Sequence, residues 1–503
     1  MSQINLLIGG SDEGHIVLDA SMANRHGLVS GATGTGKTVT LQCLAEGFSS
    51  IGVPVFVTDI KGDLSGLSRP GRAHPKIDER IEKIGISDYQ SRARPTVFWD
   101  VFETQGLPLR VTISDMGPLL LSNLLELNDT QTGIMYACFD LADEEGMLLL
   151  DLKDLKSMLG WMAQNAKQLR ADYGNISASS VAAIKRKLLV LEQQGADQFM
   201  GEPALDLNDI MITDFSGFGL INILDATRLS SRSPRVYAAF LLWFLSELYE
   251  SLPEVGDADK PKFVCFFDEA HLLFDQSSKA LVEKIEQIVR LIRSKGVGIY
   301  FITQSPLDIP EDILGQLGLR IQHALRAFTP KDKKAVNTVA ATFRPNPKLD
   351  IKQEIGMLGT GEALVSTLQS DGAPTIVQKT LIRPPESQIG PIDNNVRQEM
   401  IKRSPLYSRY FQDLDRESAF ELLKQRAKER QLQLEREQQQ EAEEKQRLAE
   451  QKAAEKAAQP KRSRGRPRQS FAEAMIKSTL RSVGSSLGRR LVRGLMGSLL
   501  GKK

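Results

Sequence analysis

The chain has 503 residues, enough for more than one domain, and its 41% hydrophobic and 25% charged residues are ordinary for a soluble globular protein. No apolar stretch is long enough to cross a bilayer, and the three cysteines form no ligand or disulfide pattern, which argues against membrane-spanning and disulfide-stabilised secreted classes. The net charge of +1 conceals a contrast, because residues 460–503 hold twelve Lys or Arg and one acidic residue, whereas residues 1–420 are acidic overall. We therefore expect a cytoplasmic protein. Contacts of the basic tail with polyanions are expected to be local to the tail.

A glycine-rich loop follows two short strands that we expect at residues 14–18 and 26–30. The loop fits the phosphate-binding pattern G-x-x-x-x-G-K-[ST] at every fixed position and comprises Gly31, Ala32, Thr33, Gly34, Thr35, Gly36, Lys37 and Thr38. Residues 39–48 have the apolar spacing of a helix, so the loop lies between a strand and a helix, and a chance glycine-rich turn is disfavoured. Backbone N–H groups at the helix N-terminus can surround a phosphate, while Lys37 reaches the β- and γ-phosphates and the Thr38 hydroxyl ligates Mg²⁺.

The next buried strand, residues 53–58, ends in the polar sequence Asp59-Ile60-Lys61-Gly62-Asp63, at the edge where α/β sheets bind their ligands. Further strands are expected at residues 96–101 and 109–113. Residues 115–208 then change to helical apolar spacing, which predicts a helical insertion in the α/β unit. Its helices are expected at residues 119–127, 135–142, 152–169 and 181–192.

A second acidic motif follows a strand expected at 219–224 and an apolar helix expected at 235–249. Residues 262–267 predict a buried strand that ends in Asp268 and Glu269. Downstream of a phosphate loop, this Asp can hold the Mg²⁺ shell and this Glu can polarise an attacking water. The alternative is that both acids simply cap a strand.

The strand expected at residues 298–303 ends at Gln304, which is placed to sense the γ-phosphate or, alternatively, forms a turn before Ser305. A helix carrying apolar residues between 285 and 292 leads into this strand, and a strand with two arginines is expected at 320–326. A helix from Pro330 and closing strands at 362–367 and 375–382 complete the unit.

We therefore predict an α/β fold with four segments. The segments are an ATPase domain at 1–385 with its insertion at about 115–208, a connecting helical segment at 386–420, a charged helical spacer at 421–459 and a basic tail at 460–503.

The basic tail contains Arg464-Gly465-Arg466-Pro467, which resembles an AT-hook; a disordered basic linker is an equal alternative. A stripe of Leu, Ile and Val with interspersed arginines follows it from residue 476 to residue 499. This amphipathic segment is too charged to span a membrane, so we expect it to dock on a partner protein, on an anionic bilayer surface or on itself.

Taken together, these motifs resemble the HerA/FtsK superfamily, and most closely the bacterial HerA-like ATPases of the YjgR type. The resemblance covers roughly residues 10–385 and includes the phosphate loop, the Asp59–Asp63 sequence, the helical insertion, Asp268-Glu269 and Thr303-Gln304. It implies a RecA-like core with an additional strand and a catalytic glutamate. It also implies a ring of identical subunits, expected to be a hexamer, that hydrolyses ATP at subunit interfaces and pumps DNA. The segment before the loop is too short for the N-terminal β-barrel of archaeal HerA proteins.

We therefore predict an Mg²⁺-dependent ATPase that translocates double-stranded DNA. A kinase is disfavoured because Glu269 beside the metal-binding Asp favours water as the acceptor. A nucleotide-gated scaffold, recruited to a membrane or a partner protein by the tail, is the alternative from another class. Ring ATPases supply an arginine to the neighbouring site, and Arg320, Arg326 and Arg293 are candidates unless they only form surface ion pairs.

Overall fold

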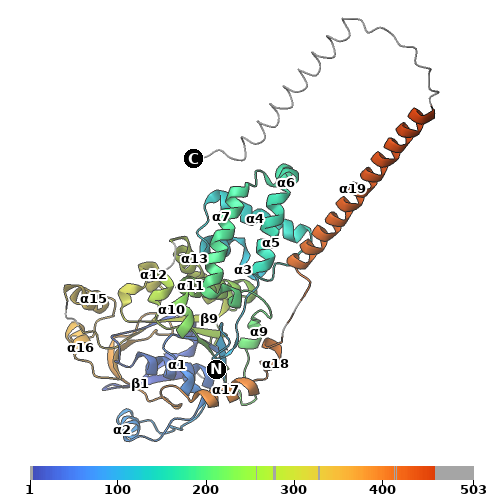
Figure 1. Ribbon diagram of the computed structural model, residues 1–503. Helices are drawn as coiled ribbons and strands as arrows, with labels where there is room; N and C mark the ends of the chain where they lie inside the picture. Colours follow the sequence, from blue (N-terminus) through green and yellow to red (C-terminus); the bar gives the residue numbers. More distant parts are fainter. Residues whose placement is uncertain are drawn as a thin grey trace, which may run out of the picture. The chain divides into compact units, whose positions relative to one another are not determined.

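The computed structural model describes residues 4–458, apart from residues 257, 276–278, 327–328, 413 and 415. Met1–Arg426 form one compact unit and Ala427–Lys503 form a second. The first unit is built on a single mixed sheet with helices packed against it (Figure 1).

The sheet has twelve strands, which lie in the order β2-β1-β12-β11-β10-β3-β9-β8-β4-β7-β5-β6. In chain order they are β1 (Asn5–Ser11), β2 (Gly14–Asp19), β3 (Gly27–Ser30), β4 (Val55–Asp59), β5 (Thr96–Asp100), β6 (Leu107–Pro108), β7 (Ile221–Asp225), β8 (Phe263–Phe267), β9 (Val297–Thr303), β10 (Leu319–Gln322), β11 (Glu362–Ser366) and β12 (Gln378–Ile382).

The strands from β10 to β6 pair in parallel, whereas β1, β2, β11 and β12 form an antiparallel extension at one side. The central strands β3, β4, β8 and β9 are buried along their whole length, as expected when helices cover both faces of a parallel sheet. Strand β9 lies between β3, which leads into the phosphate loop, and β8, which leads into the acidic pair. This is the additional strand that the family resemblance implied, and the expected α/β fold class is confirmed.

Helices α1 (Lys37–Ser50) and α11 (Pro234–Ser251) cover opposite faces of the central strands. In β8, Phe266 contacts Phe48 of α1, and Phe263 contacts Phe244 of α11. Residues three apart in a strand point to opposite faces, so the two helices enclose the sheet between them. Most of α11 is buried, which explains why its sequence is apolar almost all round.

The remaining helices outside the insertion are shorter, except for the last. They are α2 (Pro75–Ile84), α10 (Thr227–Arg232), α12 (His271–Asp275), α13 (Lys279–Leu291), α14 (Glu311–Leu314), α15 (Pro330–Ala341), α16 (Ile351–Met357), α17 (Asn394–Arg403), α18 (Tyr407–Tyr410) and α19 (Ala419–Ala458).

The helical insertion lies between β6 and β7, and its longer helices group together beyond the sheet (Figure 1). It contains α3 (Ile113–Leu124), α4 (Asp129–Glu144), α5 (Leu152–Gln164), α6 (Ala166–Tyr173), α7 (Ala178–Leu191), α8 (Asp197–Phe199) and α9 (Leu207–Ile210). Capping boxes begin α3, α4 and α5, so the sequence fixes these helix starts locally.

Two expectations for this region are wrong. Residues 109–113 do not form a strand, because the Thr112 hydroxyl caps α3 and only Val111 retains an isolated bridge, to Met200. The helix expected over residues 152–169 is interrupted at Asn165, which ends α5 and whose side chain donates a hydrogen bond to the Trp161 carbonyl at 2.9 Å. Capping side chains outweigh apolar spacing at both places.

Strand β1 was not expected from the sequence, because Gly9 and Gly10 interrupt its apolar pattern. It pairs with β2 and with β12. A Cβ atom on Gly9 would lie 2.1 Å from the Leu381 carbonyl oxygen, so the close approach of β12 requires glycine there.

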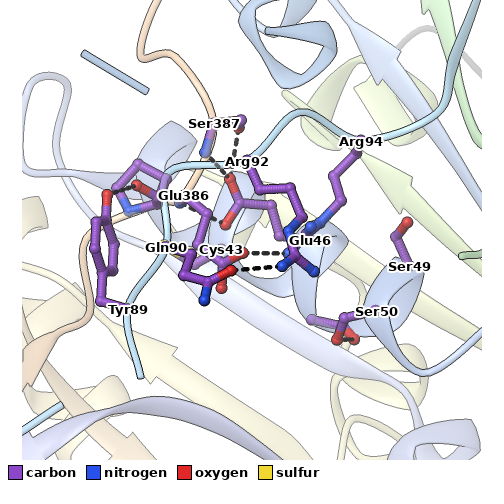
Figure 2. Close-up of polar contacts among 12 residues, drawn as sticks. Cys43, Glu46, Ser49, Ser50, Tyr89, Gln90, Arg92, Arg94, Glu386 and Ser387 are labelled. Carbon is purple, nitrogen blue, oxygen red and sulfur yellow. Dashed lines mark hydrogen bonds and ion pairs between the residues drawn. The ribbon is translucent and has the colours of Figure 1, made fainter. Parts of the chain in front are cut away.

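The chain after β12 remains packed on the first unit beyond the expected end at residue 385. A buried carboxylate holds the beginning of this segment, as Figure 2 shows. Glu46 of α1 accepts hydrogen bonds from the backbone N–H groups of Glu386 and Ser387 at 2.9 and 2.8 Å, and from Arg383 Nη2 at 3.2 Å. Glu386 in turn pairs with Arg94 at 2.6 Å. The segment is therefore held against α1, the helix that begins at the phosphate loop.

A second buried carboxylate holds the start of α19. Asp154 of α5 accepts hydrogen bonds from the Ser418 hydroxyl and from the Phe420 N–H at 2.9 Å, while the Ala419 N–H donates to the Leu148 carbonyl at 2.9 Å. The first turns of α19 are therefore joined to the helical insertion.

Helix α19 confirms the helix-forming character expected of residues 421–459, and its side chains are exposed over most of its described length. The Arg464–Pro467 sequence and the amphipathic segment lie outside the described residues. Within the described part of the chain, no helix is both long and apolar enough to span a bilayer.

Loss of the Glu46 carboxylate is expected to destabilise the first unit, because the buried N–H groups of Glu386 and Ser387 would lose their acceptor and Arg383 would lose one of its two carboxylate partners. Glu46→Ala should lower the free energy of unfolding by about 3–5 kcal/mol, measured by urea denaturation. Glu79→Ala is the control, because it removes an exposed pair with Lys83 and should leave the urea midpoint unchanged. Equal midpoints for the two variants would contradict this role of Glu46.

Candidate nucleotide-binding site

The phosphate loop turns from β3 into α1 through three glycines with positive φ angles: Gly31 at 149°, Gly34 at 77° and Gly36 at 117°. A Cβ atom on Gly31 would lie 2.6 Å from the His323 side chain, so this position has no room for another residue. The tip of the loop, at Thr33 and Gly34, is exposed. Among the residues that the structure describes, no side chain caps the N-terminus of α1, so its first N–H groups remain available to an anion.

Lys37 is almost fully buried under the loop. Its ammonium group donates hydrogen bonds to the carbonyl oxygens of Gly31 at 2.6 Å and Ala32 at 3.1 Å. Burial, followed by the positive charge of Lys61, lowers the pKa of Lys37. A phosphate would replace weak carbonyl acceptors with a full negative charge, which strongly favours binding there.

His323, which directly follows β10, contacts the end of β3 and the first turn of α1. The sequence interpretation did not select this histidine. The His323 N–H donates to the Ser30 carbonyl at 2.7 Å, and its ring nitrogens lie 2.8 Å from Thr40 Oγ1 and 2.9 Å from the Glu362 carbonyl. Burial lowers the pKa of His323 to about 4, so the ring is neutral at pH 7. A lone histidine after a strand carries no motif, so only the fold identifies it.

The acidic pair follows β8 and lies next to β9. Asp268 and Glu269 are both buried, and the Asp268 N–H donates to Thr58 Oγ1 at 3.2 Å. Burial raises the pKa of Asp268 to about 7. Burial acts in the same direction on Glu269, but the hydrogen bond and charge of Lys61 outweigh it and lower the pKa of Glu269. Glu269 also has a φ of 47°, an uncommon conformation for a residue other than glycine and one that clusters at functional sites.

Three side chains surround the Glu269 carboxylate. Lys61 Nζ lies 2.7 Å from Oε1, whereas Gln304 Nε2 and His271 Nδ1 lie 3.4 and 3.3 Å from Oε2. The structure therefore brings Gln304, the residue expected to sense the γ-phosphate, next to Glu269. The sequence indicates Lys61 only as one residue of the polar sequence Asp59–Asp63. Its pairing with Glu269 depends on the packing of β4 against β8.

The arginine candidates lie in different surroundings. The Arg320 guanidinium is half-buried and donates to the carbonyl oxygens of Leu314 and Thr342, both at 3.1 Å. Arg293 lies in a short turn before the amino end of β9, at the opposite edge of the sheet from the phosphate loop. Arg326 is exposed and follows β10 at its carboxyl end, two residues after Ala324, whose carbonyl accepts a hydrogen bond from the Ala32 N–H.

A cavity of about 580 Å³ adjoins the first turn of α1 at Gly36 and Val39. Its other walls come from α2, from the turn before β11 and from the segment that Glu46 holds in place. Ile77 and Ile389 contribute apolar surface, and Arg80 also lines the cavity. A cavity of this size and composition beside a phosphate loop suits the base and ribose of a nucleotide.

A family model described as helicase HerA-like C-terminal matches residues 5–503 of the chain. The chain is 24% identical to a protein of Sulfolobus acidocaldarius over 72% of its own length and 66% of the relative's, and 23% identical to one of Saccharolobus solfataricus over 72% and 65%. Both relatives are named DNA double-strand break repair helicase HerA. The chain thus spans slightly less than two thirds of their length.

Among solved structures, the plasmid coupling protein TrwB in complex with a non-hydrolysable GTP analogue matches 77% of this chain and 97% of its own, with a TM-score of 0.50 and 14% identity. The trigonal form of TrwB with sulphate has a TM-score of 0.50 and 15% identity over 78% of this chain and 92% of its own. At this identity the likeness establishes a shared fold.

Proposed function

The chain belongs to the helicase HerA-like C-terminal family, and we propose that it hydrolyses ATP to move double-stranded DNA through a ring of identical subunits. The observation that carries the proposal is the convergence of the phosphate loop, Gln304 and the Asp268–Glu269 pair at one edge of the sheet. Together these groups supply the parts that phosphoryl transfer to water requires.

The nucleotide phosphates would bind the N–H groups of the loop and Lys37, with the base and ribose in the adjoining cavity. The Thr38 hydroxyl and the Asp268 carboxylate are hard oxygen ligands of the kind that Mg²⁺ prefers. The buried Asp268 carboxyl, with its raised pKa, is suited to a cation as its partner. When bound, Mg²⁺ would neutralise charge on the β- and γ-phosphates.

Glu269 would accept a proton from the attacking water, and Gln304 would help to orient that water or the terminal phosphate. Lys37 would stabilise the charge that develops on the phosphoryl oxygens. The general base, which follows β8, and the cation, in the first turn of α1, would thus approach the phosphate from different elements.

The assignment to DNA rests on the relatives, which are named DNA repair helicases, and on the family match. The resemblance to the HerA/FtsK superfamily implies a ring, for which a hexamer is our working proposal. Completion of each site would then need a cation from the neighbouring subunit. Arg326 is the best placed candidate, since it is exposed, whereas Arg320 is occupied by carbonyl groups of its own subunit.

Two substitutions separate binding from hydrolysis. Lys37→Ala should abolish ATP binding, because the phosphates lose their buried cation, whereas Glu269→Gln should bind ATP without hydrolysing it. Fluorescent-nucleotide binding and phosphate release measure the two properties. Near wild-type turnover by Glu269→Gln would show that another group is the base.

Duplex DNA should accelerate wild-type turnover, whereas a nucleotide-gated scaffold predicts no stimulation.

Arg326 is expected to act across the subunit interface. Arg326→Ala should lower turnover by up to about a thousandfold, as loss of an arginine finger does, while ATP binding is retained. Mixed with Lys37→Ala, it should regain activity, because a Lys37→Ala subunit can donate Arg326 to an intact neighbouring site. Arg403→Ala removes an exposed arginine that pairs with Glu399 and serves as the control. Absence of rescue in the mixture would rule out Arg326 as the donor.

The basic tail is expected to raise DNA affinity. A truncation ending at Gln459 should bind A·T-rich duplex more weakly and with a shallower salt dependence; six lost phosphate contacts correspond to about a thousandfold change between low and moderate salt. G·C-rich duplex and anionic vesicles are the comparison ligands. Loss of vesicle binding with unchanged DNA affinity would identify the tail as a membrane anchor.

A further inference from the structure

Lys61 occupies a position in the site to which the proposed mechanism gives no role. It belongs to the turn after β4, the strand that pairs with β8 on the side away from β9. The Asp59 carboxylate fixes this turn, because it accepts hydrogen bonds from the N–H groups of Gly62 at 2.7 Å and Leu64 at 3.0 Å. Gly62 has a φ of 76°, which lets the chain reverse tightly there. The backbone that carries Lys61 is therefore held firmly, and its long side chain extends from the turn to the acidic pair.

The Lys61 ammonium joins the two acidic residues of the site. Its Nζ lies 2.7 Å from Glu269 Oε1 and 3.8 Å from Asp268 Oδ2. With Gln304 and His271 near Oε2, both oxygens of Glu269 have partners. A carboxylate that is paired with an ammonium group is a weaker base and is not directed at a water. In this arrangement Glu269 is unsuited to proton abstraction.

The same ammonium lies close to the place where the phosphates would bind. Lys61 Nζ lies 3.8 Å from Oδ2 of Asp268, the proposed Mg²⁺ ligand, and the positive charge of Lys61 helps to lower the pKa of Lys37 under the phosphate loop. The Lys61 side chain is 35% exposed, so it can change partner without unpacking the core. A terminal phosphate would attract it more strongly than a single carboxylate does.

We propose that Lys61 is a positioning residue that holds Glu269 in the nucleotide-free protein and moves to the terminal phosphate when ATP binds. Its departure frees Glu269 Oε1 to face the attacking water. ADP lacks the terminal phosphate and leaves the pair intact. This inference rests on the proposed ATPase function and adds a way for the site to distinguish ATP from ADP before hydrolysis.

The test is a cycle of four full-length proteins: wild type, Lys61→Met, Glu269→Gln and the double variant. Calorimetry with Mg²⁺ measures their affinities for ADP and for a β,γ-imido analogue of ATP. Lys61→Met should weaken analogue binding about tenfold and ADP binding less than about threefold, because one charge-assisted contact to the terminal phosphate is lost. Lys61→Arg keeps the charge and should retain most of this preference for the analogue.

The decisive quantity is the coupling between the two residues. Glu269→Gln should tighten analogue binding when Lys61 is present, because the competing ion pair is gone, and should have a clearly smaller effect in the Lys61→Met background. A lysine that only supports the fold predicts equal losses for both nucleotides. Equal losses, or the same effect of Glu269→Gln in both backgrounds, would overturn the proposal.

Lys83→Met, which removes an exposed lysine on α2, should leave both affinities unchanged and controls for the loss of one surface charge. Urea midpoints identify any variant that fails to fold, and Lys61→Gln then replaces Lys61→Met. Wild-type binding and turnover test the proposed function separately. Intact wild-type activity without coupling overturns the role of Lys61 alone, whereas a wild type that binds neither nucleotide overturns both.

Discussion

The parallel pairing of β3, β9, β8 and β4 is the constraint on which the site depends. In this register Ser30 lies opposite Thr303, Phe301 opposite Phe267, and Phe267 opposite Thr58. The chain leaves all four strands at the same edge, so residues separated by more than two hundred positions in the sequence meet within a few ångströms. Each strand contributes a different chemical group: a loop of N–H donors, an amide, a carboxylate pair and an ammonium. A shift of one strand by a single residue would turn its functional side chain toward the wrong face.

Two buried carboxylates attach the later part of the chain to this sheet. Glu46 and Asp154 each accept backbone N–H groups from segments that are distant in sequence, and each is almost completely shielded from water. A buried acid is costly unless its hydrogen bonds are satisfied, so such a group defines one arrangement of the segments around it. Through Glu46 the chain after β12 becomes a wall of the cavity beside the phosphate loop. The nucleotide site therefore includes residues far from any recognisable motif.

The sequence predicted the features that are local. The phosphate loop, the strand ends at Asp268 and Gln304, and most strands of the sheet follow from patterns that span fewer than about a dozen residues. The misses have particular causes. Strand β1 was not predicted because two glycines interrupt its apolar pattern. Residues 109–113 were predicted as a strand, but Thr112 caps a helix there, and the helix predicted over 152–169 ends at Asn165. The pairing of Lys61 with Glu269 and the support of the loop by His323 depend on which strands become neighbours. No periodicity in a single chain encodes that choice.

Ser418 and Phe420 attach the start of α19 to Asp154, a few residues before the first compact unit ends at Arg426. Asp154 belongs to α5 of the helical insertion, so the first turn of α19 is attached to that helix and not only to the chain segment that precedes it. A displacement of α5 would therefore displace the first turn of α19 as well.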